Sequence, residues 1–100
     1  MEKRTPHYPL ARIQFDVARL GSAAFTKTAL DGGRAMGLTS VEMLEVVASL
    51  RLANFYKSMT THADHRIWQD VYKPVFKGYD LYVKVQLLEG KAMVVSFKAR

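Results

Sequence analysis

Apolar residues in the first half of the chain recur at the spacing of helices. From residue 10 to residue 20 they return every three or four positions, with charged residues between them. Pro9 precedes this run and suits a first helical position, because its missing N–H would have no partner there. Gly21 follows the run. The pattern therefore predicts a helix that begins near Pro9 and ends at Gly21.

A second helix is predicted between Thr26 and about Met36. Thr26 is a favourable N-cap residue, and Gly37 suits the left-handed conformation that commonly ends a helix. Gly32 and Gly33 lie inside this range, and each lowers helix stability by about 1 kcal/mol relative to alanine. The helical pattern is therefore weaker here than over residues 10–20.

Thr39 and Glu42 have the spacing of a capping box, which predicts a third helix that runs to about Leu50. Apolar side chains cover most of its circumference, and its polar residues fall on one stripe. A helix of this kind is usually buried against a sheet. None of the three helices contains a recognisable chemical motif, so we expect them to form a scaffold.

After Asn54 the hydrophobic period changes to two, which is typical of strands. Pro74 falls within the second predicted strand, where it should lie at an edge or a bulge because it has no N–H to donate. The third predicted strand has the clearest alternation. The predicted strands cover residues 55–61, 68–76, 79–88 and 92–98.

The turn between the last two strands must keep their apolar residues on one face. A two-residue turn at Glu89 and Gly90 would place Phe97 among polar side chains, because a one-residue change of register reverses the faces. We therefore predict a three-residue loop over residues 89–91; a loop one residue earlier would shift the pairs but keep the faces. The predicted register pairs Val83 with Phe97, Val85 with Val95, Leu87 with Met93, Tyr82 with Lys98 and Lys84 with Ser96.

Together these elements predict the α+β class. We expect one domain over residues 1–100, with three N-terminal helices packed on the apolar face of an antiparallel sheet. The opposite face of the sheet should be polar and basic. Residues 1–8 are expected to form a polar arm.

Composition and charge narrow the possible functions. The chain has no cysteine, which excludes disulfides and thiolate chemistry. The absence of cysteine also suits a reducing cytoplasm, which we expect as the location. No apolar run approaches the ~20 residues of a membrane span or follows the charged N-terminus, so we expect no membrane segment and no signal peptide. Residues 1–50 carry a net charge of +1 and residues 51–100 a net charge of +5. This asymmetry favours a polyanionic partner, RNA or DNA before membrane, although ordinary solubilising charge would look the same.

His62 and His65, with Asp64 between them, could be read as metal ligands. The cluster lacks a third histidine and any cysteine, so a solvent-exposed loop is the competing interpretation. The basic half has only four acidic residues, too few for a two-metal nuclease centre. No catalytic triad, phosphate-binding glycine loop or paired-carboxylate motif is recognisable.

Seven polar residues on the predicted strands and their connecting loop remain as candidates. A solvated sheet face would account for them. Alternatively, such a face can cleave RNA, because cations hold phosphates, aromatic rings stack on bases, and hydroxyl or ammonium groups transfer protons. RNA cleaves itself when its 2′-hydroxyl is deprotonated, the phosphorane is neutralised and the leaving 5′-oxygen is protonated. None of these steps requires a metal or a cofactor. The candidates are Lys57, Arg66, Gln69, Lys73, Tyr82, Lys84 and Lys98.

Several segments of the chain also resemble a known family. The longest match comprises FYKSMTT at residues 55–61, Asp64–His65 and IWQDVY at residues 67–72; MEKRTPH at residues 1–7 and VSFK at residues 95–98 extend it to both ends. These segments resemble the motility quorum-sensing regulator (MqsR) toxins, which are RelE-like messenger-RNA interferases that inhibit translation. The resemblance implies a RelE-like fold and metal-independent cleavage of messenger RNA, preferentially around GCU. It also implies a cognate antitoxin with a zinc-bearing N-terminal part and a helix-turn-helix C-terminal part, so that DNA is contacted only through the antitoxin.

The resemblance further implies that Lys57, Gln69, Tyr82 and Lys98 are the catalytic residues. We expect Lys57 to act as the base, with its pKa lowered by the cations of Lys98 and Arg66. A non-catalytic nucleic-acid-binding regulator and a pure protein-interaction module are the alternatives. In the catalytic interpretation Lys98 stabilises the phosphate, Tyr82 donates a proton or stacks on a base, Gln69 positions the phosphate, and Arg66, Lys73 and Lys84 hold the RNA backbone.

Overall fold

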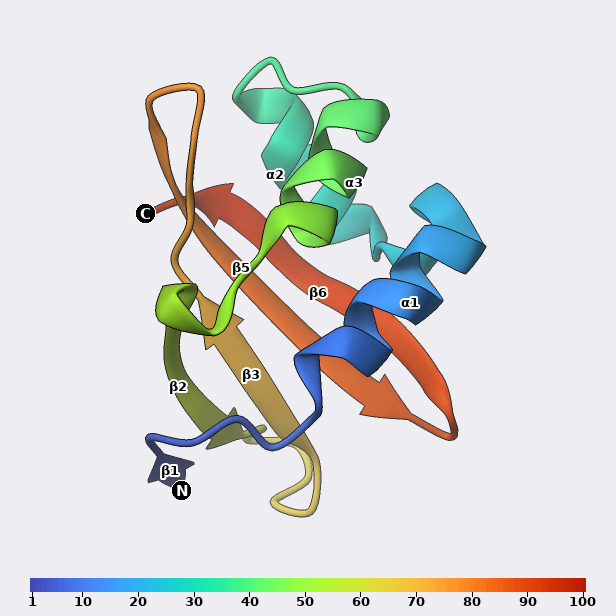
Figure 1. Cartoon of the computed structure of the whole chain (residues 1–100). Coiled ribbons are helices and arrows are strands. Elements are labelled where there is room, and N and C mark those ends of the chain that lie inside the picture. Colours follow the sequence, from blue (N-terminus) through green and yellow to red (C-terminus); the bar gives the residue numbers. More distant parts are fainter.

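Three helices cover one face of an antiparallel sheet in the computed structural model, which describes residues 1–100 (Figure 1). This confirms the predicted α+β class. No helix combines the length and the hydrophobicity that crossing a membrane requires. The helices are α1 (Leu10–Leu20), α2 (Lys27–Ala35) and α3 (Ser40–Ser49), and the 3₁₀ turns are η1 (Gly21–Ala24) and η2 (Leu52–Asn54). The strands are β1 (Glu2–Lys3), β2 (Phe55–Thr60), β3 (Trp68–Tyr72), β4 (Val75–Phe76), β5 (Tyr79–Leu88) and β6 (Lys91–Ala99).

The strands lie in the order β1, β2, β3, β5 and β6, and every pair is antiparallel. The short strand β4 pairs with the first residues of β5. The predicted strand over residues 68–76 is therefore divided, and Pro74 lies at the break between β3 and β4. This agrees with its expected place at an irregularity, since proline cannot donate to the ladder.

The helix ends follow the predicted capping signals. The Thr26 side chain accepts a hydrogen bond from the backbone N–H of Ala29, and Thr39 and Glu42 form the expected capping box. Gly37 has a φ of 80°, and the N–H of Leu38 donates to the carbonyl of Gly33, which closes α2 in the way that a left-handed glycine permits. Pro9 is the one small difference, because it precedes the first helical residue rather than occupying that position.

The two glycines inside α2 are explained by close packing. A Cβ on Gly32 would lie 2.1 Å from the carbonyl oxygen of Phe97 in β6, and one on Gly33 would lie 2.0 Å from the sulfur of Met43 in α3. Both positions therefore require a residue without a side chain. The two glycines lower the helix propensity of α2, but they allow it to pack closely against both β6 and α3.

The predicted three-residue loop between β5 and β6 is wrong. A bulge, rather than a longer loop, keeps the apolar residues of both strands on one face. Glu89 and Gly90 form a two-residue turn with φ values of 54° and 74°, as the right-handed twist of a hairpin favours. A bulge beside Val85 then inserts the extra residue. The pairs Val83–Phe97, Tyr82–Lys98 and Lys84–Ser96 are as predicted, whereas Val85 faces Val94 rather than Val95, and Leu87 faces Ala92 rather than Met93.

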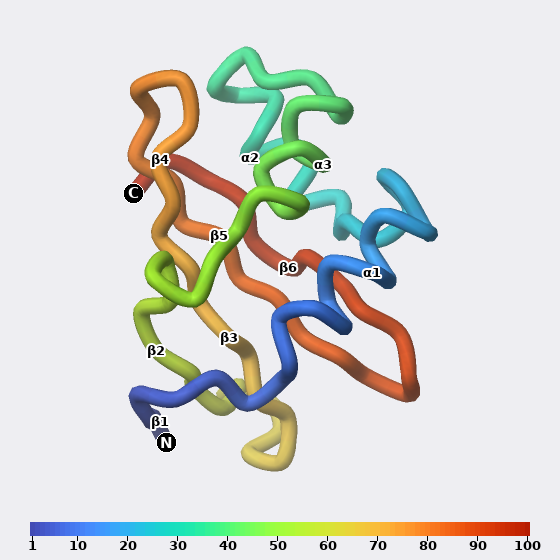
Figure 2. Tube along the Cα trace, viewed as in Figure 1, coloured from blue at the N-terminus to red at the C-terminus, as the bar shows by residue number.

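The N-terminal segment forms part of the sheet and is not the free polar arm that we expected. Glu2 and Lys3 pair with the middle of β2 as strand β1. The segment then crosses the end of β3 on its way to α1 (Figure 2). There the fully buried carboxylate of Asp70 accepts hydrogen bonds from the backbone N–H groups of His7 and Tyr8.

The hydrophobic core lies between the helices and the sheet. Asp16 is a buried charged group at its border, where its carboxylate accepts hydrogen bonds from Arg19 and from the N–H of Ala92. These two bonds hold the pKa of Asp16 below its usual value, and the bond from Ala92 also fastens α1 to the β5–β6 hairpin. The largest fully buried core side chains are Tyr72, Phe97, Ile13, Met43 and Leu81.

We predict that Gly32→Ala destabilises the protein more than Gly33→Ala does. The new methyl group at residue 32 meets a backbone carbonyl that cannot move without shifting β6, whereas at residue 33 it meets a flexible methionine side chain. Overpacking of this kind costs about 1–3 kcal/mol. Denaturant unfolding of both variants measures the difference. Equal stability of wild type and Gly32→Ala would contradict the close contact.

Candidate active site on the open face of the sheet

The candidate residues come from the face of the sheet that the helices leave uncovered, which we call the open face. In β5 the side chains of Leu81, Val83 and Val85 are fully buried toward the helices, so that Tyr82 and Lys84 point the other way. Directly opposed residues in neighbouring strands share a face. The open face therefore carries one row of Lys57, Val71, Lys84 and Ser96, and the next row carries Tyr82 and Lys98.

Tyr82 lies at the centre of this group. The ammonium nitrogen of Lys98 is 5.2 Å from the centroid of the Tyr82 ring, and that of Lys84 is 5.8 Å away. Partial burial raises the pKa of the Tyr82 hydroxyl, while the charge of Lys57 opposes that rise. The phenol therefore holds its proton at neutral pH, in a position surrounded by cations.

Lys57 has a charged partner that the sequence did not suggest. Its ammonium group forms an ion pair with the carboxylate of Glu2 in β1. The hydrogen bond from this pair raises the pKa of Lys57 and lowers that of Glu2. The expected lowering of the Lys57 pKa is therefore wrong for this structure, and Arg66, named as one of its causes, forms an ion pair with Asp64 in the loop before β3.

The lowered pKa that was expected of Lys57 belongs to Lys84 instead. Its side chain is half-buried between Val71 and Ser96 on the adjoining strands. Burial lowers its pKa, and the charges of Lys98 and Lys57 lower it further. The cluster thus contains two lysines whose pKa values shift in opposite directions.

Tyr56 and Arg4 also belong to the site, although the sequence analysis did not select them. Tyr56 lies at a bulge in β2, between Phe55 and Lys57. The Lys73 ammonium is 3.4 Å from its ring centroid, that of Lys57 is 5.4 Å away, and the Arg4 guanidinium carbon is 5.5 Å away. The bulge could not be read from the sequence, and Arg4 reaches the ring only because β1 joins the sheet.

Gln69 lies on the same face, one row away from the lysines. Its side-chain amide donates a 2.9 Å hydrogen bond to the side-chain oxygen of Gln86 in β5. The two glutamines thus hold each other in place beside the cluster. Arg66, by contrast, is an exposed loop residue whose guanidinium is engaged by Asp64.

The loop between β2 and β3 carries the two histidines. His62 and His65 are both exposed, and Asp64 uses its carboxylate to accept bonds from the backbone and side chain of Arg66. This agrees with the interpretation of the segment as a solvent-exposed loop. Nowhere in residues 1–100 do three histidine, aspartate or glutamate side chains gather as a metal-binding group.

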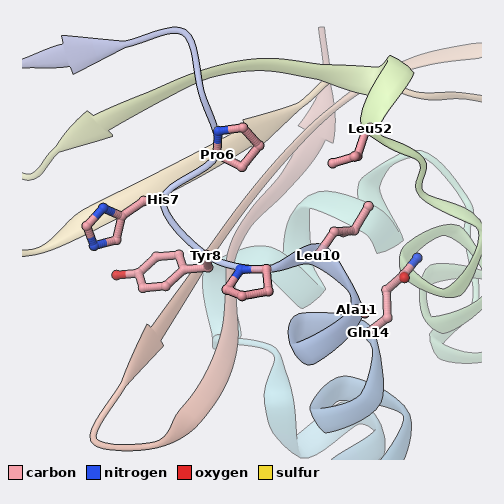
Figure 3. Close-up of a pocket in the computed structure, with 8 residues that line it drawn as sticks. Pro6, His7, Tyr8, Leu10, Ala11, Gln14 and Leu52 are labelled. Carbon is pink, nitrogen blue, oxygen red and sulfur yellow. The ribbon is translucent and has the colours of Figure 1, made fainter.

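The larger of two surface grooves lies elsewhere, between the N-terminal segment and α1 (Figure 3). Its volume is about 650 Å³. It contains no lysine or arginine, and the side-chain amide of Gln14 is already bonded to carbonyls at the end of α3. This groove therefore contributes nothing to the basic cluster. Its lining residues are Pro6, His7, Tyr8, Pro9, Leu10, Ala11, Gln14 and Leu52.

Comparison with known proteins agrees with the sequence resemblance. The model of the family described as motility quorum-sensing regulator, toxin of MqsA, matches residues 5–99. The mRNA interferase toxin MqsR of Escherichia coli (strain K12) is 39% identical over 100 residues, and the match covers all of both chains. The chain therefore belongs to the motility quorum-sensing regulator family of toxins.

Proposed function

We propose that this chain is an mRNA interferase toxin, a metal-independent endoribonuclease that stops translation and is neutralised by a cognate antitoxin. The observation that carries the proposal is the group of Lys57, Lys84 and Lys98 around Tyr82 on the open face, in a chain of this family. Its relative in E. coli is named an mRNA interferase. The proposed catalytic set is Lys57, Gln69, Tyr82 and Lys98.

The chemistry needs only groups that the chain supplies. The 2′-hydroxyl of the RNA gives its proton to a basic side chain of the site, the 2′-oxygen attacks the adjacent phosphorus, and the bond to the 5′-oxygen breaks. Ammonium groups of Lys57 and Lys98 would stabilise the charge on the phosphorane, and the Tyr82 hydroxyl would protonate the leaving oxygen. Gln69, held by Gln86, would orient the phosphate.

The RNA would extend from this centre toward the edge of the sheet formed by β1 and β2. Tyr56 with its three cations offers a ring for a base and positive charge for the backbone phosphates. We assign to Lys73 the role of holding the RNA backbone there. Arg66 would meet the strand only at the loop, because its guanidinium is bound to Asp64.

The finer features of the family are part of the same proposal. We expect a RelE-like fold relationship, a preference for cleavage around GCU, and an antitoxin with a zinc-bearing N-terminal part and a helix-turn-helix C-terminal part. The family description, toxin of MqsA, supports the existence of the partner. Any contact with DNA would then be made by the antitoxin.

Purified protein should cleave messenger RNA in the presence of excess EDTA and leave 5′-hydroxyl and 2′,3′-cyclic phosphate ends. At saturating protein, Lys57→Ala, Tyr82→Phe and Lys98→Ala should each lower the single-turnover rate by about 100-fold. Lys27→Ala, on α2 at the helical side, is the matched control. RNA binding without cleavage by the wild type would favour a non-catalytic regulator, and wild-type rates in both lysine variants would mean that the site is misassigned.

RNA affinity should fall steeply with salt, because the open face binds phosphates through lysine and arginine side chains. The expected slope on a single strand is about 0.7 log units per log salt for each phosphate neutralised. Lys73→Ala should reduce this slope by about that amount, and Lys27→Ala should not change it. Filter binding between low and physiological salt measures the slope, and a flat dependence would exclude this binding mode.

Expression of the chain alone should arrest bacterial growth, and co-expression of its cognate antitoxin should relieve the arrest. The proposed cause is loss of messenger RNA, so the arrest should disappear in Lys98→Ala and persist in Lys27→Ala at equal protein levels. Growth curves with immunoblots provide the measurement. Normal growth with abundant folded wild-type protein would count against the toxin assignment.

A further inference from the structure

The three lysines of the open face differ in their access to negative charge. Lys57 has the carboxylate of Glu2, which β1 brings beside it. Two other carboxylates, on β3 and in the loop before it, are occupied: Asp70 accepts bonds from the N-terminal segment on the helical side, and Asp64 is bound to Arg66. Glu2 is therefore the one carboxylate that contacts a lysine of this cluster.

Lys84 occupies the middle of the cluster without such a partner. The groups around it are Tyr82 and Gln86 on its own strand, Val71 on β3, Ser96 and Lys98 on β6, and, beyond Val71, Lys57 on β2. Two of these are cations, and Val71 is apolar and fully buried. Its surroundings therefore destabilise the ammonium form of Lys84 and lower the pKa of the side chain.

We propose that Lys84, rather than Lys57, takes the proton from the 2′-hydroxyl of the RNA, and that Glu2 is a positioning residue that keeps Lys57 as a fixed positive charge. This rests on the proposed ribonuclease function and assigns the division of roles within that site. Glu2 lies in β1 near the N-terminus and Lys98 lies in β6 near the C-terminus, so both ends of the chain contribute to one reaction centre.

The proton balance of the step is complete with groups of this chain. The neutral Lys84 amine accepts the 2′-hydroxyl proton and becomes an ammonium ion. The bond between the 2′-oxygen and phosphorus forms while the bond between phosphorus and the 5′-oxygen breaks. The leaving 5′-oxygen takes the proton of the Tyr82 hydroxyl, and exchange with water restores both side chains.

The geometry allows both lysines to reach one phosphate. Lys57 and Lys84 are separated by a single residue, Val71, across two strand spacings, so their backbones lie about 10 Å apart. A phosphate held between the two side chains would contact an ammonium group fixed by Glu2 and an amine whose pKa is lowered. A base must be a neutral amine, whereas an electrostatic stabiliser must be an ammonium ion. Two lysines with the same pKa would not fill both roles at one pH.

The proposal has a definite dependence on pH. A base acts in its neutral form, so the single-turnover rate should rise as the pH rises through the pKa of Lys84, which lies below the ordinary lysine value. Lys57 stays charged through the same range, because its pKa lies above that value. The rise should then level off before Lys57 begins to lose its proton.

Arginine substitutions separate the two roles, because arginine keeps its charge at every accessible pH. With messenger RNA as the substrate, Lys84→Arg should cleave about 100-fold more slowly than wild type at all pH values and bind RNA within a few-fold of wild type. Lys57→Arg should retain cleavage within about 10-fold of wild type, a loss well below that of a missing base. Lys27→Arg is the control. Wild-type cleavage by Lys84→Arg would overturn the proposal, and so would a loss in Lys57→Arg as large as that in Lys84→Arg.

A second measurement does not depend on activity. In an NMR titration of the side-chain ε-methylene groups without RNA, Lys84 should have a lower midpoint than Lys57, and Glu2→Gln should lower that of Lys57. A Lys84 midpoint at or above that of Lys57 would overturn the division of roles even if the wild type cleaves RNA. If the midpoints follow this order but wild-type protein cleaves no RNA, the proposed function fails and the assignment of Lys84 as its base fails with it.

Discussion

The bulge in the β5–β6 pair is the constraint on which the core and the open face both depend. Had the two-residue turn continued into a regular ladder, Phe97 would lie opposite Tyr82, and Lys98 would point toward the helices. Burying an unpaired ammonium ion there would cost several kcal/mol. The extra residue reverses the side chains after it, so that Phe97 is fully buried and Lys98 lies against the Tyr82 ring.

Helix α2 holds this bulge in place. The hydroxyl of Thr26 donates to the carbonyl of Val95 and accepts from the N–H of Ala29, so one side chain both bonds the bulged strand and caps the helix. The N–H of Thr26 also donates to the carbonyl of Val94. Further along the helix, Gly32 lets α2 approach the carbonyl of Phe97. The scaffold therefore determines where Lys98 lies, although α2 has no residue on the open face.

Local signals predicted the helices and the two faces of the sheet, because caps and hydrophobic period depend on neighbouring residues. The sequence did not decide between a longer loop and a bulge, because both place Phe97 on the apolar face. The turn geometry at Glu89 and Gly90 decides between them. Strand β1 has two residues, too short for a period, and its place depends on β2, more than fifty residues away. The ion pair between Glu2 and Lys57, and with it the direction of the Lys57 pKa shift, could not be predicted without that strand.

Clustered cations make the open face electrostatically unfavourable for the isolated protein. Lys57, Lys84 and Lys98 repel one another, and burial of Lys84 adds a desolvation cost. The hydrophobic core on the other side of β5 offsets this cost, because Leu81, Val83 and Val85 each contribute about 1.5–3 kcal/mol by complete burial. A polyanion that binds the face would remove the repulsion between the lysines. The same strand thus carries the apolar residues that stabilise the fold and, at alternate positions, the charges whose repulsion favours a phosphate ligand.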